Sequence, residues 1–124
     1  MKKILILDDK ESIAKILFMY LGKENNTIWF DNAKKGLDWL NEGHRPDLII
    51  TDLSMPFMNG VEFVEAIKAN EHYKDIKIIV LSSNDSTTEK IHLLELGVED
   101  YITKPFNPIE LRTRVKNILE KIKN

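Results

Sequence analysis

The sequence predicts an α/β fold in which an open parallel β-sheet is covered by helices on both faces. Three observations lead to this prediction. Short apolar runs, too short for helices, alternate regularly with longer stretches of helical period. The runs are apolar on successive residues, which is typical of strands buried on both faces of a parallel sheet. The β–α unit occurs five times, whereas a closed barrel of such units needs about eight, so the sheet is expected to stay open.

Five runs rich in β-branched and aromatic residues are expected to form the strands. They are Ile4–Leu7, Ile28–Phe30, Leu48–Ile50, Ile78–Leu81 and Tyr101–Ile102. Each run is followed by a stretch in which apolar residues recur about three or four positions apart, the pattern of a helix with one buried face. The helices are expected around Ile13–Leu21, Ala33–Leu40, Val61–Ile67, Ile91–Val98 and Leu111–Ile122.

Strict alternation and right-handed crossovers restrict the topology, and the flavodoxin-like strand order 2-1-3-4-5 is the leading prediction. Helices on both sides of the sheet would make a three-layer sandwich. The chain of 124 residues is long enough to bury one core, so a single domain is expected over residues 1–124.

Composition and charge narrow the range of partners. The net charge is −2 with basic and acidic residues interspersed, so neither nucleic acid nor a membrane surface is an expected direct partner. There is no cysteine, which excludes disulfides, thiol catalysis and thiolate metal sites and fits a reducing cytoplasm. The apolar run behind Lys2 and Lys3 ends at Asp8, too soon for a signal peptide or a membrane span. We therefore expect a cytoplasmic location.

Polar residues follow the predicted strands at the edge where an open α/β sheet binds ligands. That site lies beyond the carboxyl ends of the strands, where the winding reverses between the first and third strands. The first strand ends in Asp8 and Asp9 and the third in Asp52. The fourth strand ends in Ser82, and the fifth leads into Lys104. Three carboxylates, a hydroxyl and an ammonium group are therefore expected at one edge.

The three carboxylates would repel one another, and a divalent cation removes this conflict. Oxygen ligands without Cys or paired His favour a hard ion, and an open carboxylate site suits Mg²⁺. With Lys104 as a second positive charge, these are the groups that phosphoryl transfer uses. Asp52 is the best candidate nucleophile, because it follows the most apolar strand and lies centrally among these groups. Carboxylate nucleophiles that form aspartyl phosphates are an established chemistry.

Four segments carry these residues: ILDDKES, DLIITDLSMPFMNG, IIVLSSND and DYITKPFNPIEL. In this order, and over essentially the whole chain, they resemble the receiver domain of two-component response regulators. The chain is similar to single-domain receivers of the chemotaxis-regulator kind. A start at Met1 and an end after the fifth helix suit a stand-alone receiver, although a domain excised from a longer regulator would be cut at the same place.

The resemblance implies a role for each matching residue. Asp52 would be the phosphoacceptor. Asp9 and Asp52 would bind Mg²⁺ directly, together with the backbone carbonyl of Ser54. Asp8 would contact the metal mainly through water, and Lys104 would contact first the acceptor and then the phosphoryl group. Such a domain promotes only its own phosphorylation and dephosphorylation, so it is not expected to be an enzyme.

The resemblance also implies how the signal leaves the site. Ser82 matches the switch hydroxyl, Tyr101 the switch aromatic residue, and Pro105 the proline whose preceding peptide bond is cis. Phosphorylation of Asp52 would draw Ser82 inward and give Tyr101 room to turn. The altered surface would be helix four, strand five and helix five. The implied partners are a sensor histidine kinase or phosphotransfer protein upstream and a target protein on that surface downstream.

A phosphorylation-dependent homodimer through the same surface is also considered. Its ion pairs would join Glu99, Asp100, Arg112 and Arg114. Phosphoryl loss is expected to be slow to intermediate, because Ser54 and Asn84, which flank the site, offer no acid or base to orient the attacking water.

Plainer interpretations of single residues stay open. Asp8 and Asp9 alone would be explained as caps of the first helix, and Asp85 or Ser86 as the cap of the fourth. Tyr101 alone would be explained by core packing with a solvated hydroxyl. Trp29 and Trp39 are interpreted as hydrophobic cover at the sheet edge and on the second helix.

Three rival functions share parts of this pattern. A Mg²⁺-dependent phosphatase also uses an aspartate nucleophile, but the haloacid-dehalogenase type needs Asp-x-Asp-x-Thr after its first strand, and DDKES lacks it. A flavodoxin should have a phosphate loop rich in Ser, Thr and Gly, whereas two carboxylates would repel the flavin phosphate. The third rival is a degenerate receiver kept only as a protein-interaction module, and the complete acidic set argues against it.

Overall fold

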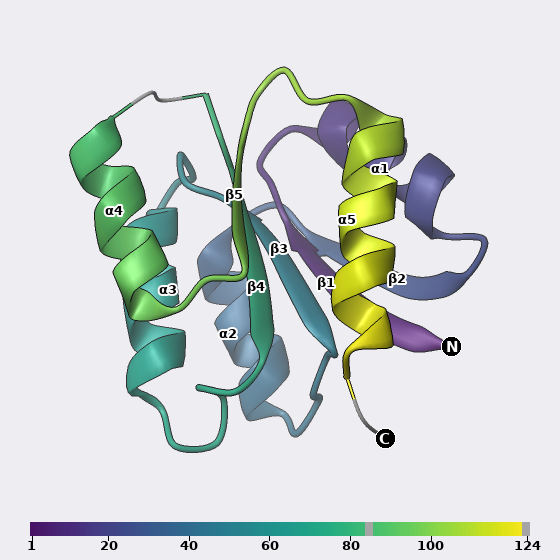
Figure 1. Cartoon of the computed structure of the whole chain (residues 1–124). Helices are drawn as coiled ribbons and strands as arrows, with labels where there is room; N and C mark the ends of the chain where they lie inside the picture. Colours follow the sequence, from purple (N-terminus) through teal and green to yellow (C-terminus); the bar gives the residue numbers. More distant parts are fainter. Residues whose placement is uncertain (84–85, 123–124) are drawn as a thin grey trace.

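The computed structural model describes residues 1–83 and 86–122, and strands and helices alternate strictly along them (Figure 1). In chain order they are β1 (Lys2–Leu7), α1 (Glu11–Leu21), β2 (Asn25–Phe30), α2 (Ala33–Asn41), β3 (Leu48–Asp52), α3 (Gly60–Ala69), β4 (Lys77–Ser82), α4 (Thr87–Leu96), β5 (Asp100–Thr103) and α5 (Pro108–Glu120). The strands form one sheet in the order β2-β1-β3-β4-β5, and every neighbouring pair is parallel. The predicted fold class and strand order are confirmed.

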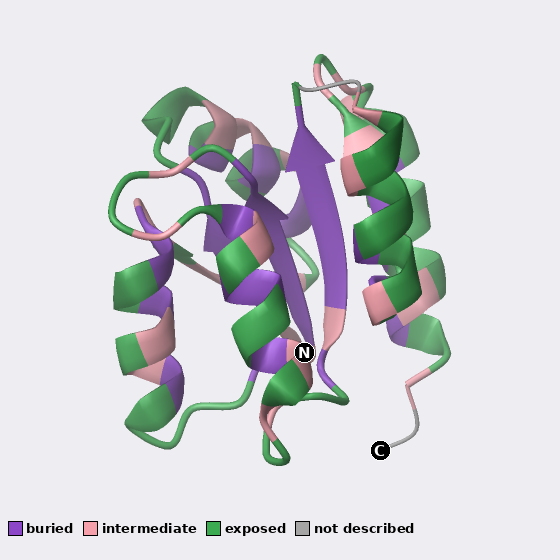
Figure 2. Ribbon diagram, turned by 90° about the vertical axis from the view of Figure 1, so that its left-hand side faces the viewer, coloured by how far each residue is buried: buried purple, intermediate pink, exposed green. Residues whose placement is uncertain are grey.

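The helices form two layers with the sheet between them. Helices α1 and α5 pack on one face, and α2, α3 and α4 pack on the other (Figure 1). Each face therefore has its own apolar core. Figure 2 shows the buried strands running between the two helical layers.

Strand β1 shows why the strand sequences are apolar throughout. Leu5 and Leu7 belong to the core beneath α2, α3 and α4, and Ile4 and Ile6 belong to the core beneath α1 and α5. Because successive side chains of a strand point to opposite faces, a strand covered on both sides has no face left for polar residues. The first polar residue after such a run therefore marks the point where the strand leaves the core.

Most elements extend beyond the predicted apolar runs, and the differences are largest in β2, α4 and α5. Strand β2 begins at Asn25 rather than Ile28, because it is an edge strand that pairs only with β1 and tolerates polar side chains. Helix α5 ends at Glu120 rather than Ile122. Helix α4 spans Thr87–Leu96 rather than Ile91–Val98.

Among the described residues, none of the helices has the length and apolar character needed to cross a bilayer.

The ends of α4 explain its shift along the chain. Ser86 is the N-cap, and its hydroxyl accepts the N–H of Glu89 at 3.3 Å, as one of the two predicted caps. The other predicted cap, Asp85, lies outside the described residues. Gly97 ends the helix with φ of 99°, the left-handed conformation that glycine adopts at no steric cost. Val98 therefore lies beyond the helix, although it is buried as its apolar character predicts.

Candidate functional site

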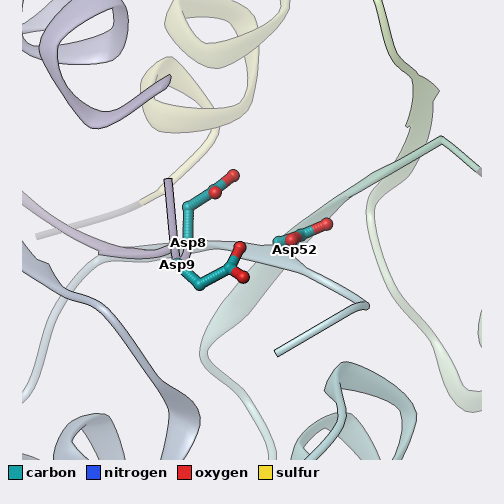
Figure 3. A group of neighbouring side chains, drawn as sticks. All are labelled: Asp8, Asp9 and Asp52. Atoms are coloured by element: carbon teal, nitrogen blue, oxygen red, sulfur yellow. The ribbon is translucent and has the colours of Figure 1, made fainter. Parts of the chain in front are cut away.

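Three carboxylates meet at the C-terminal edge of the sheet. Asp8 and Asp9 follow β1, Asp52 ends β3, and these two strands are paired neighbours. One carboxylate oxygen of each residue lies within 4.8 Å of the other two, and Figure 3 shows Asp9 turned toward Asp52. Asp8 is 1% and Asp52 5% exposed, whereas Asp9 is exposed. Two of the three negative charges are therefore buried and need compensation from nearby groups.

Lys104 supplies part of that compensation. Its Nζ lies 3.0 Å from Oδ2 of Asp8 and 3.3 Å from Oδ1 of Asp52, and its side chain is only 13% exposed. The end of β4 holds this segment in place, because the N–H of Lys104 donates to the carbonyl of Ser82 at 2.7 Å. The peptide bond between Lys104 and Pro105 is cis, the isomer that the resemblance implies.

The balance of these charges is visible at Asp52. Burial of its carboxylate, reinforced by the negative charge of Asp8, raises the pKa of Asp52 above its usual value. Lys104 acts in the opposite direction, as does a hydrogen bond from the backbone N–H of Ser54. Because the pKa rises overall, Lys104 offsets only part of the cost of placing the Asp52 charge here.

Asp8 and Asp9 do not cap α1. The N-cap position is occupied by Lys10, and no side chain makes a capping hydrogen bond there. Oδ1 of Asp8 instead accepts the N–H of Lys10 at 2.9 Å, ahead of the helix. The capping interpretation of these two residues is therefore wrong: the carboxylate of Asp8 contacts Lys104, and that of Asp9 lies near Asp52.

The turn after β3 brings the start of α3 against Asp52. The N–H of Gly60 donates to the carbonyl of Leu53 at 2.8 Å, and a Cβ at Gly60 would lie 2.6 Å from the Cα of Leu53. Only glycine allows so close an approach. A capping box then starts the helix, since Asn59 and Glu62 each accept the other's backbone N–H. The helix start thus fixes the backbone on which Asp52 and Ser54 stand.

The predicted switch residues lie on the next two strands. Ser82 ends β4 and is 2% exposed, and it lines a depression of about 370 Å³ together with Asp52 and Ser54. Tyr101 lies on β5 and is 8% exposed. The ammonium group of Lys90 lies 5.7 Å from the centre of that ring. Asn84, expected to flank the site, lies outside the described residues.

The four residues proposed for dimer ion pairs do not share one surface. Arg114 lies 2.6 Å from Asp100 and 2.9 Å from Glu110, on the side of α5 next to β5. The guanidinium of Arg112 instead lies 5.8 Å from the ring of Tyr20 on α1. Residues i and i+2 of a helix point in nearly opposite directions. Arg112 therefore lies on a different side of α5 from Arg114, and the dimer ion pairs stay a prediction.

One residue at the site escaped the sequence interpretation. Trp29, expected only to cover the sheet edge, donates its indole Nε1–H to the backbone carbonyl of Asp8 at 2.8 Å. It is 38% exposed and lies at the end of the edge strand β2. The signal available in the sequence was that the single N–H of a half-buried tryptophan usually finds an acceptor.

A comparison with protein families shows which family the chain belongs to. The model described as "Response regulator receiver domain" matches residues 4–116. The chain belongs to this family. Receiver domains are signalling modules that interact with histidine kinases and downstream effectors.

Individual receivers resemble the chain over nearly its whole length. The regulatory protein VanR of Enterococcus faecium is 38% identical over 98% of this chain and 51% of its own length. A chemotaxis protein CheY homolog of Campylobacter jejuni is 30% identical over 94% of this chain and 92% of its own. Among solved structures, the receiver domain of a signal transduction histidine kinase from Syntrophus aciditrophicus superposes with a TM-score of 0.90 at 30% identity, covering 100% of this chain and 94% of that one. The chain spans about half the length of the first curated relatives it matches.

Proposed function

We propose that this receiver domain is a phosphorylation-dependent switch in which Asp52 accepts a phosphoryl group from a histidine kinase or a phosphotransfer protein. One observation carries the proposal: the buried carboxylate of Asp52 lies beside a lysine ammonium group and two further carboxylates at the end of the central strands. Burial raises the pKa of Asp52 and so disfavours its bare charge. In an acyl phosphate the negative charge is carried by the phosphoryl oxygens instead of the carboxylate. The proposal places the domain in the cytoplasm, where kinases find ATP.

The same carboxylates suit a divalent cation. Their donors are all oxygen atoms, which favour a hard ion such as Mg²⁺ over softer metals. Asp9 and Asp52, with the backbone carbonyl of Ser54, would hold the ion directly, and Asp8 would hold it through water. The Mn²⁺-bound form of response regulator Rcp1, 27% identical to this chain with a TM-score of 0.85, supports a divalent ion here. When bound, Mg²⁺ would neutralise phosphoryl oxygens during transfer.

In the transfer step, this chain supplies the nucleophile and a positive charge, and the donor supplies the phosphoryl group. A carboxylate oxygen of Asp52 attacks the phosphorus atom of a phosphohistidine in line, forming a phosphorus–oxygen bond. The phosphorus–nitrogen bond breaks, and the imidazole leaves with its electron pair and takes up a proton. Lys104, which lies 3.3 Å from Asp52, stabilises the negative charge that develops on the phosphoryl oxygens.

The output follows from the new acceptor oxygens. The phosphoryl oxygens attract the hydroxyl of Ser82 and the ammonium of Lys104 as hydrogen-bond donors. The end of β4 therefore moves toward Asp52. Tyr101 then turns toward the vacated space. The affected surface carries a groove of about 420 Å³ between α4, β5 and α5, lined by Lys90, Leu94, Tyr101 and Arg114 among others. A target protein that prefers the phosphorylated form binds there.

A homodimer through the same surface remains the second proposal for the output. Asp100 and Arg114 are already joined within one chain at 2.6 Å. In a dimer such a pair would exchange partners across the symmetry axis, so Asp100→Asn should weaken the phosphorylated dimer without preventing phosphorylation. Sedimentation velocity of both proteins, with and without beryllofluoride, measures this.

The test of the phosphoacceptor uses acetyl phosphate with Mg²⁺ and intact-protein mass spectrometry. The native chain should gain the mass of one phosphoryl group, and Asp52→Asn should gain none. Asp38→Asn, which removes an exposed carboxylate on α2, is the matched control and should be phosphorylated like the native chain. Phosphate gained by the Asp52 variant would place the acceptor elsewhere.

The same samples separate the rival functions. A degenerate receiver would bind neither Mg²⁺ nor beryllofluoride, so its amide NMR spectrum would not change. A phosphatase would turn over the donor continuously, whereas a switch retains one phosphoryl group per chain. We expect the bound group to be lost slowly to moderately, because Ser54 offers no acid or base to the attacking water. A half-life of seconds would contradict that expectation.

A further inference from the structure

The indole of Trp29 is bonded to the peptide that joins two of the three carboxylates. Its Nε1–H donates to the carbonyl of Asp8 at 2.8 Å. That carbonyl belongs to the peptide unit between Asp8 and Asp9. Trp29 lies on β2 opposite Ile6 of β1, so the contact reaches past the end of β1 to its following turn.

The two carboxylates on either side of this peptide are held very differently. The carboxylate of Asp8 has its own partners, because Oδ2 contacts Lys104 and Oδ1 accepts the N–H of Lys10. Over residues 1–83 and 86–122, the carboxylate of Asp9 makes no hydrogen bond or ion pair. Asp9 nevertheless points toward Asp52 (Figure 3). Its direction must come from the backbone.

A peptide unit is planar, so fixing its carbonyl also fixes where the next Cα stands. The Asp8 N–H, on the preceding peptide, bonds to the carbonyl of Phe30 at 3.3 Å. Strand β2 thus holds the turn at two successive peptides, once through its backbone and once through the Trp29 side chain. Only the second of these acts on the peptide that carries Asp9.

We propose that Trp29 is a positioning residue for the divalent-cation site, which holds Asp9 in its ligating direction through the Asp8 carbonyl. The inference rests on the proposed Mg²⁺ site. A purely apolar role does not account for the contact, since the ring is 38% exposed on an edge strand and its one polar atom is used on this peptide. A phenyl ring would cover the same surface without the N–H.

The test separates the hydrogen bond from the ring. Trp29→Phe removes the N–H and part of the ring, and benzothienylalanine at position 29, introduced by an expanded genetic code, keeps the ring shape with sulfur in place of N–H. The matched control is Trp39→Phe, because Trp39 packs on the α2 side, stacked 4.6 Å from His44. For each protein, Mg²⁺ affinity is measured by amide NMR titration, and the free energy of unfolding is measured without Mg²⁺.

Loss of one hydrogen bond to a neutral group predicts a Kd for Mg²⁺ about fivefold higher in both position-29 variants. Trp39→Phe should lose stability without a change in Kd. The fluorescence should agree: Trp39→Phe, whose only tryptophan is Trp29, should change emission on Mg²⁺ addition, and Trp29→Phe should not.

Each result decides the inference. An unchanged Kd in the benzothienylalanine protein overturns it, even if Trp29→Phe fails to fold. An equal rise in Kd for Trp39→Phe also overturns it, because the effect would then be general. Failure of the native chain to bind Mg²⁺ would instead overturn the proposed function, so the two failures are distinguishable.

Discussion

Lys104→Met tests whether the buried acids depend on a single ammonium group. The ammonium lies 3.0 Å from Asp8 and 3.3 Å from Asp52, whose side chains are 1% and 7% exposed. Methionine keeps an unbranched side chain of similar length and removes the charge. Within the described residues, no other lysine or arginine lies within 4.0 Å of either carboxylate. The variant therefore leaves two buried negative charges beside each other.

The size of the effect follows from the distances and the burial. At an effective dielectric constant of about 20, unit charges roughly 3 Å apart attract by about 5 kcal/mol. Much of this is offset in the native chain by the cost of desolvating the ammonium, and removal of one partner from a buried pair costs about 3–5 kcal/mol. Because Lys104 keeps some solvent contact, we expect a loss near the lower end, about 3 kcal/mol.

Urea unfolding followed by circular dichroism measures the loss at pH 7 without divalent ions. Lys104 lowers the pKa of Asp52, so without it the folded-state pKa of Asp52 should rise further above its unfolded value. The deficit should therefore be complete at neutral pH and shrink as the pH falls toward the unfolded-state pKa of about 4, below which the acids are protonated in both states. Saturating Mg²⁺ should also reduce the loss of unfolding free energy, since the ion replaces the missing positive charge.

The matched control is Lys15→Met, which removes an ammonium that is 75% exposed and 3.5 Å from Glu11. Exposed pairs of this kind contribute about 0.5 kcal/mol or less. If Lys104→Met lost no more than this control, or if its deficit were the same at pH 4 and pH 7, the charge argument would be refuted.

Three further predictions concern the site and the core that supports it. Asp52→Asn should raise the free energy of unfolding at pH 7 by about 1–2 kcal/mol, the scale of a buried group's desolvation. The folded-state pKa of Asp52 is raised, so the gain should disappear as urea titrations are repeated below the unfolded-state pKa; a gain that persisted in acid would rule out charge as its cause. Gly60→Ala should cost about 1–3 kcal/mol by forcing the start of α3 away from Leu53, and should weaken Mg²⁺ binding in NMR titrations. Phe63→Ala, in the core beneath α3, should cost about 3–5 kcal/mol in urea unfolding without changing the Mg²⁺ affinity of the molecules that remain folded.

The fold was predictable because its strands are buried on both faces. Runs such as Ile4–Leu7 have no polar residue, and only a strand between two helical layers requires that. The prediction was weakest where burial is one-sided. Strand β2 lies at the edge of the sheet and begins with two asparagines, so its first residues are polar and do not look like part of a buried strand. The end of α4 was missed for another reason, since Gly97 ends the helix while the buried Val98 continues the apolar period.

The convergence of the site was predictable because parallel strands deliver their C-terminal residues to one edge. Asp8, Asp52 and Lys104 lie far apart in sequence, yet the strand order alone brings them together. The sequence was a weaker guide to which side of a helix each side chain faces. Arg112 and Arg114 were assigned to one surface, although their spacing of two residues places them about 200° apart on a helix of 3.6 residues per turn.

The charge at the site explains why both Lys104 and Trp29 matter. Three carboxylates face one ammonium group, which leaves two negative charges that a divalent ion would neutralise. Lys104 contacts Asp8 and Asp52 on the buried side, so it cannot orient the exposed Asp9. An ion arriving from solvent meets Asp9 first. If nothing fixed the Asp9 side chain, it would lose conformational entropy when it bound the ion, and this loss would weaken binding. A hydrogen bond that fixes the peptide before Asp9 removes part of that cost in advance, which is what the position of the Trp29 indole provides.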